Sequence, residues 1–168
     1  MCGITVALSV VFLLLSYFPN FTYAVPAITG LLTMMLVIEI NVKWAFAAYL
    51  AASVLVFIFA EPESKLMYIC LFGYYPIVKA LIERINKPVI EWLLKLAVFN
   101  AAVLLIYAVF AEKFGISLDD FGILGKYGAY IFLGLANAVV VLYDITVSRL
   151  SGAYMYRIHP RVKKLLKI

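Results

Sequence analysis

The chain has 168 residues, of which 67% are hydrophobic and 14% are charged, and its formal net charge is +5. Soluble domains are roughly half apolar and about a quarter charged, so this chain could not cover its apolar surface with its own polar groups. The composition excludes a soluble globular domain and indicates a protein whose solvent is lipid.

Cysteine and histidine are too scarce for the usual metal and disulfide sites. Cys2 and Cys70 are too few for a disulfide framework, and their spacing fits no metal site. His159 is the only histidine and lies in a basic tail. We expect no metal, no cofactor, no histidine-based catalytic triad and no nucleic-acid partner.

Apolar stretches follow one another along most of the chain. We interpret six of them as membrane crossings, near 3–18, 25–41, 43–60, 66–84, 89–111 and 126–149. A helix rises about 1.5 Å per residue, so roughly 20 apolar residues cross the hydrocarbon core. The breaks carry turn-forming and helix-starting residues such as Pro19-Asn20, Pro26, Glu61-Pro62 and Pro88. The sequence therefore predicts an all-α polytopic membrane protein with six transmembrane helices.

The basic residues predict the orientation of the six crossings. One side would hold ten of them, Lys43, Lys79, Arg84, Lys87, Arg149, Arg157, Arg161, Lys163, Lys164 and Lys167. The other side would hold three, Lys65, Lys113 and Lys126. The positive-inside rule then places both termini in the cytoplasm of a cell, which we expect to be bacterial, with the chain in its plasma membrane.

Two regions follow from this orientation. Residues 1–150 would form the six-helix transmembrane domain, and residues 151–168 a basic, amphipathic cytoplasmic tail. We expect the tail to lie against anionic lipid, at about 1 kcal/mol for each basic residue near the surface.

The fourth stretch contains a proline close to the middle of the membrane. Pro76 has no backbone N–H, so it leaves the carbonyl of Phe72 without its helical partner. We expect a kink in the helix at this point.

Four charged residues lie at the predicted cytoplasmic ends of the fourth and fifth stretches. Lys79 and Glu83 are four residues apart, as are Glu91 and Lys95, and this spacing favours ion pairs along one helix face. We interpret them as a charge cluster at the membrane boundary. A docking surface for a cytoplasmic partner is the alternative, and a proton relay is a third interpretation.

Tyrosine and asparagine side chains recur at three- and four-residue spacing on the later stretches. The candidate lining of a substrate pocket is Tyr68, Tyr75, Asn100, Tyr107, Tyr127, Tyr130 and Asn137. Polar groups facing lipid are costly, so these faces should point into the bundle. A small-molecule pocket is mostly apolar with a few placed polar groups. The alternative is ordinary hydrogen bonding between helices.

Two further segments complete the candidate site. The loop that contains Asn20, Phe21, Thr22 and Tyr23 could cover such a pocket from outside. The third stretch carries two small-xxx-small pairs, made by Ala47 with Ala51 and by Ala48 with Ala52. Such pairs permit close approach of helices within the bundle or of another subunit.

The stretch "ALSVVFLLLSYFPNFTYAVPAITGLLTMMLVIEINVKWAFAAYLAAS" resembles the first three helices of the substrate-binding S components of energy-coupling factor (ECF) vitamin transporters. Both have a Pro-containing outer loop, a tight inner turn and an Ala-rich helix. The resemblance implies that the outer loop closes over substrate and that alanine motifs meet a membrane coupling subunit. The alanine pairs of this chain lie on the third stretch, whereas the first has only Gly3 and Ala7.

The leading functional hypothesis is a substrate-binding membrane subunit of an uptake transporter for a small, vitamin-like metabolite. It would take its ligand from outside, and partner ATPases would supply energy, since the chain has no phosphate-binding loop. The alternative is a membrane scaffold, because the rod-shape protein MreD has a similar layout. A membrane enzyme ranks lowest, because Asp144 is the only carboxylate well inside the last stretch. We therefore expect no catalytic residues.

Overall fold

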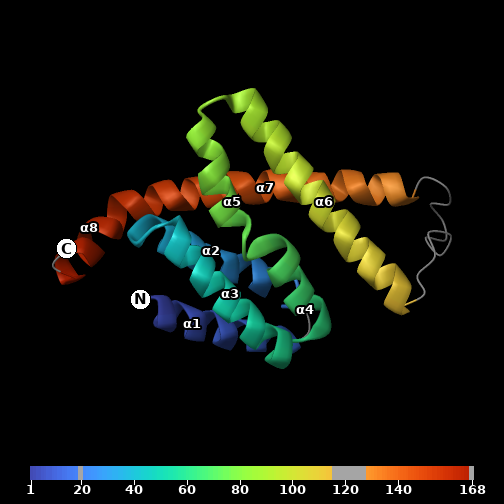
Figure 1. Ribbon diagram of the computed structural model, residues 1–168, viewed down its shortest axis with the longest axis horizontal. Helices are drawn as coiled ribbons and strands as arrows, with labels where there is room; N and C mark the ends of the chain where they lie inside the picture. The colour runs from blue at the N-terminus through green and yellow to red at the C-terminus, as the bar shows by residue number, and fades with distance from the viewer. Residues whose placement is uncertain (19–20, 115–127, 167–168) are drawn as a thin grey trace.

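The computed structural model describes residues 1–18, 21–114 and 128–166, and this part of the chain is helical without any strand (Figure 1). The helices are α1 (Cys2–Leu14), α2 (Ala24–Glu39), α3 (Val42–Phe59), α4 (Pro62–Met67), α5 (Tyr75–Ile82), α6 (Pro88–Phe114), α7 (Gly128–Arg157) and α8 (His159–Leu166). Shorter helical turns follow α1 (Leu15–Tyr17), α4 (Tyr68–Phe72) and α5 (Glu83–Ile85). The predicted all-α class is confirmed.

Four of the helical segments are long and apolar enough to cross a membrane. They are Val42–Phe59, Pro62–Ile85, Pro88–Ile106 and Leu133–Arg157. Two shorter apolar segments, Cys2–Tyr17 and Ala24–Glu39, precede them. The chain is therefore a membrane protein. Each of the six predicted stretches corresponds to a helical segment, and four of these reach the length that a crossing requires.

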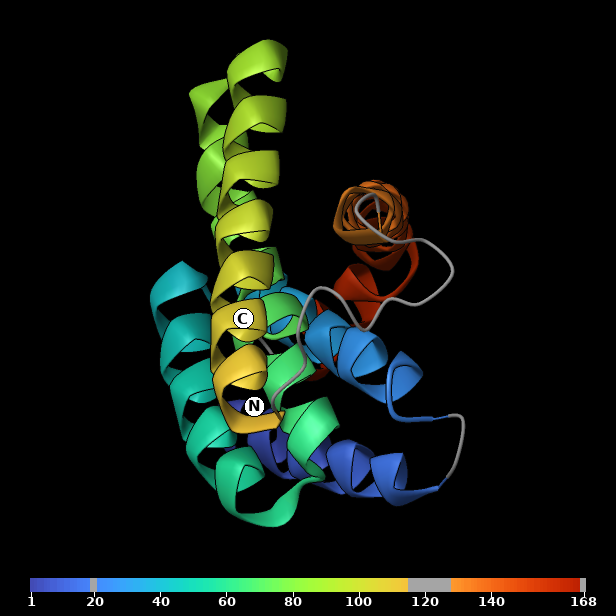
Figure 2. The same ribbon diagram turned by 90° about the vertical axis from the view of Figure 1, so that its right-hand side faces the viewer.

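The first three helices pack into one group, and α5 lies against it (Figures 1 and 2). Ala45, Ala48 and Ala52 line the inner face of α3, where they are buried in a core with Leu13 of α1 and Leu36 of α2. Small side chains let the helix backbones approach closely, which is how membrane helices gain packing energy. Both ends of the described chain lie at the same end of the molecule, left in Figure 1.

Short turns separate the helices, and local side chains explain their positions. Asn41 precedes α3, and its side-chain oxygen accepts a hydrogen bond from the backbone N–H of Trp44 at 3.0 Å, which caps the helix. Asn86 has a φ of 54°, in the left-handed region that ends helices. Pro88 then starts α6 at a position where its missing N–H costs nothing.

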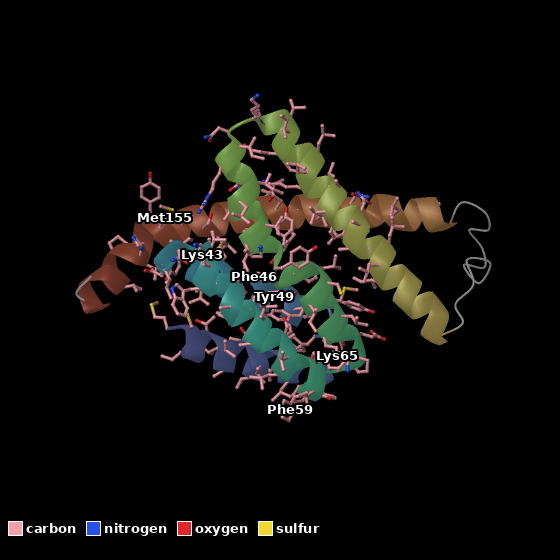
Figure 3. The ribbon with its side chains drawn as sticks, in the orientation of Figure 1. Lys43, Phe46, Tyr49, Phe59, Lys65 and Met155 are labelled. Carbon is pink, nitrogen blue, oxygen red and sulfur yellow. The ribbon has the colours of Figure 1, made fainter. Side chains whose placement is uncertain are left out.

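The fourth stretch is interrupted before Pro76, so the predicted kink is confirmed. Residues Tyr68–Phe72 form a π-helical turn, in which the N–H of Gly73 bonds to the carbonyl of Tyr68 at 2.7 Å. This longer bond leaves the Ile69 carbonyl without its usual partner. The Tyr49 hydroxyl, on α3 (Figure 3), donates to that carbonyl at 2.7 Å. The interruption is thus stabilised from a neighbouring helix.

The same interruption brings α2 very close to the chain after α4. A Cβ atom on Gly30 would lie 2.5 Å from the carbonyl oxygen of Phe72. This is the carbonyl that lacks a helical donor because Pro76 has no N–H. One turn away, the Tyr143 hydroxyl of α7 donates to the Ala27 carbonyl at 3.3 Å. Glycine at position 30 is therefore required by the close crossing of α2 and the π-helical turn.

Candidate functional site

Four ionised side chains form a closed ring where α5, α6 and α7 meet. This charge ring consists of Lys79, Glu83, Lys95 and Asp144. The Nζ atom of Lys79 lies 2.6 Å from Glu83 and 2.5 Å from Asp144. The Nζ atom of Lys95 lies 2.9 Å from Glu83 and 3.2 Å from Asp144. Positive and negative groups alternate around the ring, and its formal charge sums to zero.

Three members of the ring are buried, and further donors fix the Asp144 carboxylate. The side chains of Lys79, Lys95 and Asp144 are 5%, 6% and 5% exposed. The Tyr75 hydroxyl donates to Asp144 Oδ1 at 2.9 Å. Buried ions are costly unless they are paired and hydrogen-bonded, and the ring satisfies that condition by linking three helices.

Glu83 differs from the other members because its side chain is 43% exposed. It lies at the end of α5, where a single 3-10 turn leads towards α6. Its Oε1 atom is the contact of both Lys79 and Lys95. The ring is therefore closed inside the bundle and open to the surface at one carboxylate.

The structure confirms one predicted ion pair and replaces another. Lys79 pairs with Glu83 as the four-residue spacing predicts. Lys95 contacts Glu83 and Asp144, whereas its spacing predicted a pair with Glu91. The two lysines are also buried rather than displayed at a docking surface, because the carboxylate of α7 draws their ammonium groups inward. The sequence singled out Asp144 only as the one carboxylate well inside the last stretch, and its contacts with the two lysines were not predicted.

Two of the predicted pocket-lining asparagines lie opposite each other. Each side-chain amide of Asn100 (α6) and Asn137 (α7) donates to the oxygen of the other at 3.0 Å. Each also donates to the carbonyl one turn earlier on its own helix, at 2.8 Å. The pair joins α6 to α7 and matches the alternative reading of hydrogen bonding between helices.

The predicted tyrosines are distributed over separate places. Tyr75 contacts the charge ring, while Tyr68 is 1% exposed and lies in the core formed with α1 and α3. Tyr127 lies outside the described residues, and so do the side chains of Tyr107 and Tyr130. Among the described side chains, the structure brings Asn100 and Asn137 together, whereas Tyr75 lies at the ring and Tyr68 in the core.

A small void lies beside Tyr68. It measures about 160 Å³ between the atoms around it but does not admit a water molecule, and its lining residues are Thr5, Val6, Ser9, Thr33, Leu36, Ala48, Tyr49, Ala52 and Tyr68. A wider groove of about 620 Å³ runs along the outer face of α3 between Leu50, Ile58 and Ile69. It is open and apolar, as expected for a surface that faces lipid.

Residues of the predicted lid loop are fastened to the start of α4. The Thr22 hydroxyl donates to Glu61 at 3.3 Å, and the Tyr23 hydroxyl donates to Glu63 at 3.1 Å. The buried Ser64 hydroxyl donates to the Thr22 carbonyl at 2.9 Å. The hydrogen bond to the Glu63 carboxylate raises the pKa of Tyr23.

The other two lid residues, Phe21 and Asn20, differ from Thr22 and Tyr23 in what the structure describes of them. Phe21 is 54% exposed, and Asn20 lies outside the described residues. The hydrogen bonds of Thr22 and Tyr23 place the α1–α2 connection next to the α3–α4 connection. Lys65 of α4 and Phe59 of α3, both labelled in Figure 3, lie at this end of the molecule, and Lys43 lies at the other end of α3.

The two alanine pairs of α3 have different surroundings. Ala48 and Ala52 are buried in the core shared with α1 and α2. Ala47 and Ala51 are exposed on the outer face of the helix. One small-xxx-small pair is thus used within the bundle, and the other is presented to the surroundings.

The C-terminal region continues the last crossing before it turns. Helix α7 runs without a break to Arg157, past the predicted boundary at residue 150, and α8 begins at His159. The Nδ1 atom of His159 lies 3.1 Å from Glu39, the last residue of α2, whose side chain is 5% exposed. This contact holds the start of the tail against the bundle.

Metal ligands do not gather in the part of the chain that the structure describes, since no three His, Cys, Asp or Glu side chains there could hold an ion together. Composition, fold and the charge ring define a helical membrane protein with an ion network between its later helices. Comparisons of the chain with protein-family models, curated proteins and solved structures found no match.

Proposed function

We propose that the chain is a substrate-binding membrane subunit of a small-molecule uptake system, energised by partner subunits. The observation that carries the proposal is the charge ring. Ionisable residues between membrane helices are rare, and each is by default a candidate for a functional site, such as a substrate or ion pathway. The layout of the first 88 residues, which resembles the S components of ECF transporters, supports the same function.

The proposal includes six crossings with both termini in the cytoplasm. Helix α3 is long enough to span, and the Tyr17 hydroxyl donates to the carbonyl of Phe59 at its far end, at 3.1 Å. The start of α2 lies at that same end, through Tyr23 and Glu63. Since α2 leads directly into the start of α3, these contacts support a crossing by α2 and hence by α1.

Native mass spectrometry of protein extracted gently from its own membranes tests the function, because it reports bound solutes and bound subunits together. We expect a stoichiometric small molecule on the wild type. Tyr75→Phe, which removes only the hydrogen bond to Asp144, should reduce its occupancy, because the ring would be held less firmly. Thr146→Ala is the matched control, since its hydroxyl bonds only to Leu142 of its own helix.

A preparation that carries no solute, while retaining its fold by size-exclusion chromatography, would argue against the uptake function. Equal solute occupancy in Tyr75→Phe and the wild type would separate the solute site from the charge ring. The bound solute would still support uptake, but the charge ring would no longer be evidence for it.

A scaffold for another membrane protein is the second candidate, and the outer face of α3 favours it. Ala47 and Ala51 are exposed there, four residues apart, and small residues allow another helix to approach closely. A scaffold predicts a stable protein complex without solute in the same mass spectrum. Ala47→Leu should dissociate that complex, whereas Ala48→Leu, in the core, should destabilise the chain itself.

A further inference from the structure

The two buried lysines of the charge ring share one carboxylate oxygen. Nζ of Lys79 lies 2.6 Å from Glu83 Oε1, and Nζ of Lys95 lies 2.9 Å from the same atom. Two ammonium groups that converge on a single oxygen make short, charge-assisted hydrogen bonds. The same arrangement would bind an oxygen of an anionic ligand. In this structure Glu83 Oε1 occupies that position.

The two carboxylates of the ring are held with different strength. Asp144 is buried, and it contacts Lys79, Lys95 and the Tyr75 hydroxyl. Glu83 is 43% exposed and lies where α5 gives way to a short 3-10 turn. Its side chain can swing outward without unpacking a helix, while Asp144 stays in place.

Charge balance favours a second anion once Glu83 has left. Lys79 and Lys95 would then face Asp144 alone, with a net charge of +1 among buried groups. An uncompensated buried charge is strongly unfavourable, so the opened ring would attract an anion from solution or from the membrane boundary.

We propose that Glu83 occupies the place of a ligand's anionic group, and that a carboxylate or phosphate oxygen of the ligand replaces Glu83 Oε1 between Lys79 and Lys95. This inference rests on the proposed uptake function and deepens it, because it assigns the solute an anionic group. A lipid headgroup phosphate offers the same oxygen chemistry, and the experiment distinguishes the two sources.

The test uses Glu83→Ala, which vacates a carboxylate-sized space beside the two lysines. The full chain is placed in phosphatidylcholine nanodiscs, and Tm is measured in sodium acetate or sodium phosphate against sodium chloride of equal ionic strength. We expect acetate and phosphate to raise the Tm of Glu83→Ala saturably, and to raise that of the wild type less, because Glu83 competes. If the alanine variant does not fold, Glu83→Gln replaces it; glutamine keeps the side-chain volume but removes the competing negative charge, so we expect a smaller rise that still exceeds that of the wild type.

Two matched variants complete the design. Glu91→Ala removes an acid from α6, one turn before Lys95, and should respond to acetate and phosphate only as much as the wild type does, because Glu91 is not part of the ring. Glu83→Ala combined with Lys95→Met should lose the rise, because one ammonium group is gone and Lys79 with Asp144 remains neutral. A rise that survives in this double variant would overturn the assignment of the anion to the ring.

A response to acetate and phosphate no larger than to chloride, in both Glu83 variants, would overturn the anion site. It would not overturn the uptake function, since a solute found by native mass spectrometry could bind elsewhere. Nanodiscs that also contain phosphatidylglycerol test the other source. If that lipid raises the Tm of Glu83→Ala and removes the response to acetate, the anion site stands, but the solute assignment fails.

Discussion

At the scale of single residues, Asp144 is the side chain on which the charge ring depends. It is the only ring member that receives hydrogen bonds from both lysines and from Tyr75. We predict that Asp144→Asn lowers the free energy of unfolding by about 3–5 kcal/mol, because two buried ammonium groups would then share one half-exposed carboxylate. Unfolding by sodium dodecyl sulfate titration in mild detergent measures the loss.

The second substitution at this site tests whether charge balance is the cause. Asp144→Asn combined with Lys95→Met removes one positive and one negative charge, so part of the stability should return. Thr146→Ala, on the exposed face of the same helix, should stay close to the wild type. If Asp144→Asn alone were as stable as the wild type, the ring would not be the ion network described here.

The Asn100–Asn137 pair gives a second prediction at this scale. Replacing either residue by Leu should lower stability by about 0.6 kcal/mol, the average for hydrogen bonds between membrane helices, and by about 1.7 kcal/mol at most. The double variant should lose less than the sum of the two single losses, because each single variant leaves the other amide without its interhelical partner.

A double-mutant cycle from detergent unfolding curves measures this coupling. Additive losses would mean that each asparagine is stabilised by its own helix, through the bonds to Leu96 and Leu133, rather than by the other asparagine.

Residue spacing predicted part of the site. The four-residue spacing predicted the Lys79–Glu83 pair, and the faces that carry Asn100 and Asn137 were predicted to point inward, as these two residues do. The partner of Lys95 could not be predicted in this way. Local spacing offers one neighbour on the same helix, whereas the observed partners lie on other helices, and their proximity depends on how α7 crosses α5 and α6 (Figure 2).

At the scale of elements, the crossing of α2 and the π-helical turn is the tightest backbone contact we describe. We predict that Gly30→Ala lowers stability by about 1–3 kcal/mol, as overpacking does. The added Cβ would meet the backbone oxygen of Phe72, which cannot rotate away. Gly134→Ala is the control, because nothing lies within 4 Å of its Cβ position.

The control should move in the opposite direction. Alanine is favoured over glycine inside a helix by roughly 0.5–1 kcal/mol, so Gly134→Ala should be neutral or slightly stabilising. Thermal unfolding of both variants in the same detergent provides the comparison. Equal stability of Gly30→Ala and the wild type would show that the two backbones can separate without cost.

Sequence alone predicted where the fourth stretch breaks but not how. Pro76 removes a backbone donor, and that loss is visible in the sequence. The π-helical turn also needs an external donor for the freed Ile69 carbonyl, and Tyr49 of α3 supplies it. No rule of spacing connects residues 49 and 69, so this detail emerges only when the helices are packed together.

At the scale of the whole molecule, the number of membrane crossings depends on the first two apolar segments. Segments Cys2–Tyr17 and Ala24–Glu39 are shorter than the four long ones. At 1.5 Å per residue each rises about 24 Å, somewhat less than the roughly 30 Å hydrocarbon core. A short helix can still cross where the bilayer thins locally. The contact between the α1–α2 and α3–α4 connections is the basis on which we propose six crossings.

We predict six crossings, and cysteine labelling tests this directly. All variants carry Cys70→Ala. The native Cys2 then reports the position of the N-terminus. Three further variants, which also carry Cys2→Ser, report the connections: Phe21→Cys, Pro62→Cys and Lys87→Cys. A membrane-impermeant maleimide should label positions 21 and 62 in intact cells. It should label positions 2 and 87 only after the cells are permeabilised, because the basic ends face the cytoplasm.

Positions 2 and 21 together test whether α1 crosses the membrane, because α1 is the helix between them. Labelling of both from the same side would mean that α1 does not cross the membrane, and the predicted count of six crossings would be wrong. Position 62 is the internal control. It follows α3, which is long enough to span, and should be labelled from the side opposite Lys87→Cys, because one long helical segment separates them. Labelling of 21 together with 62, and of 2 together with 87, would support six crossings with both termini in the cytoplasm.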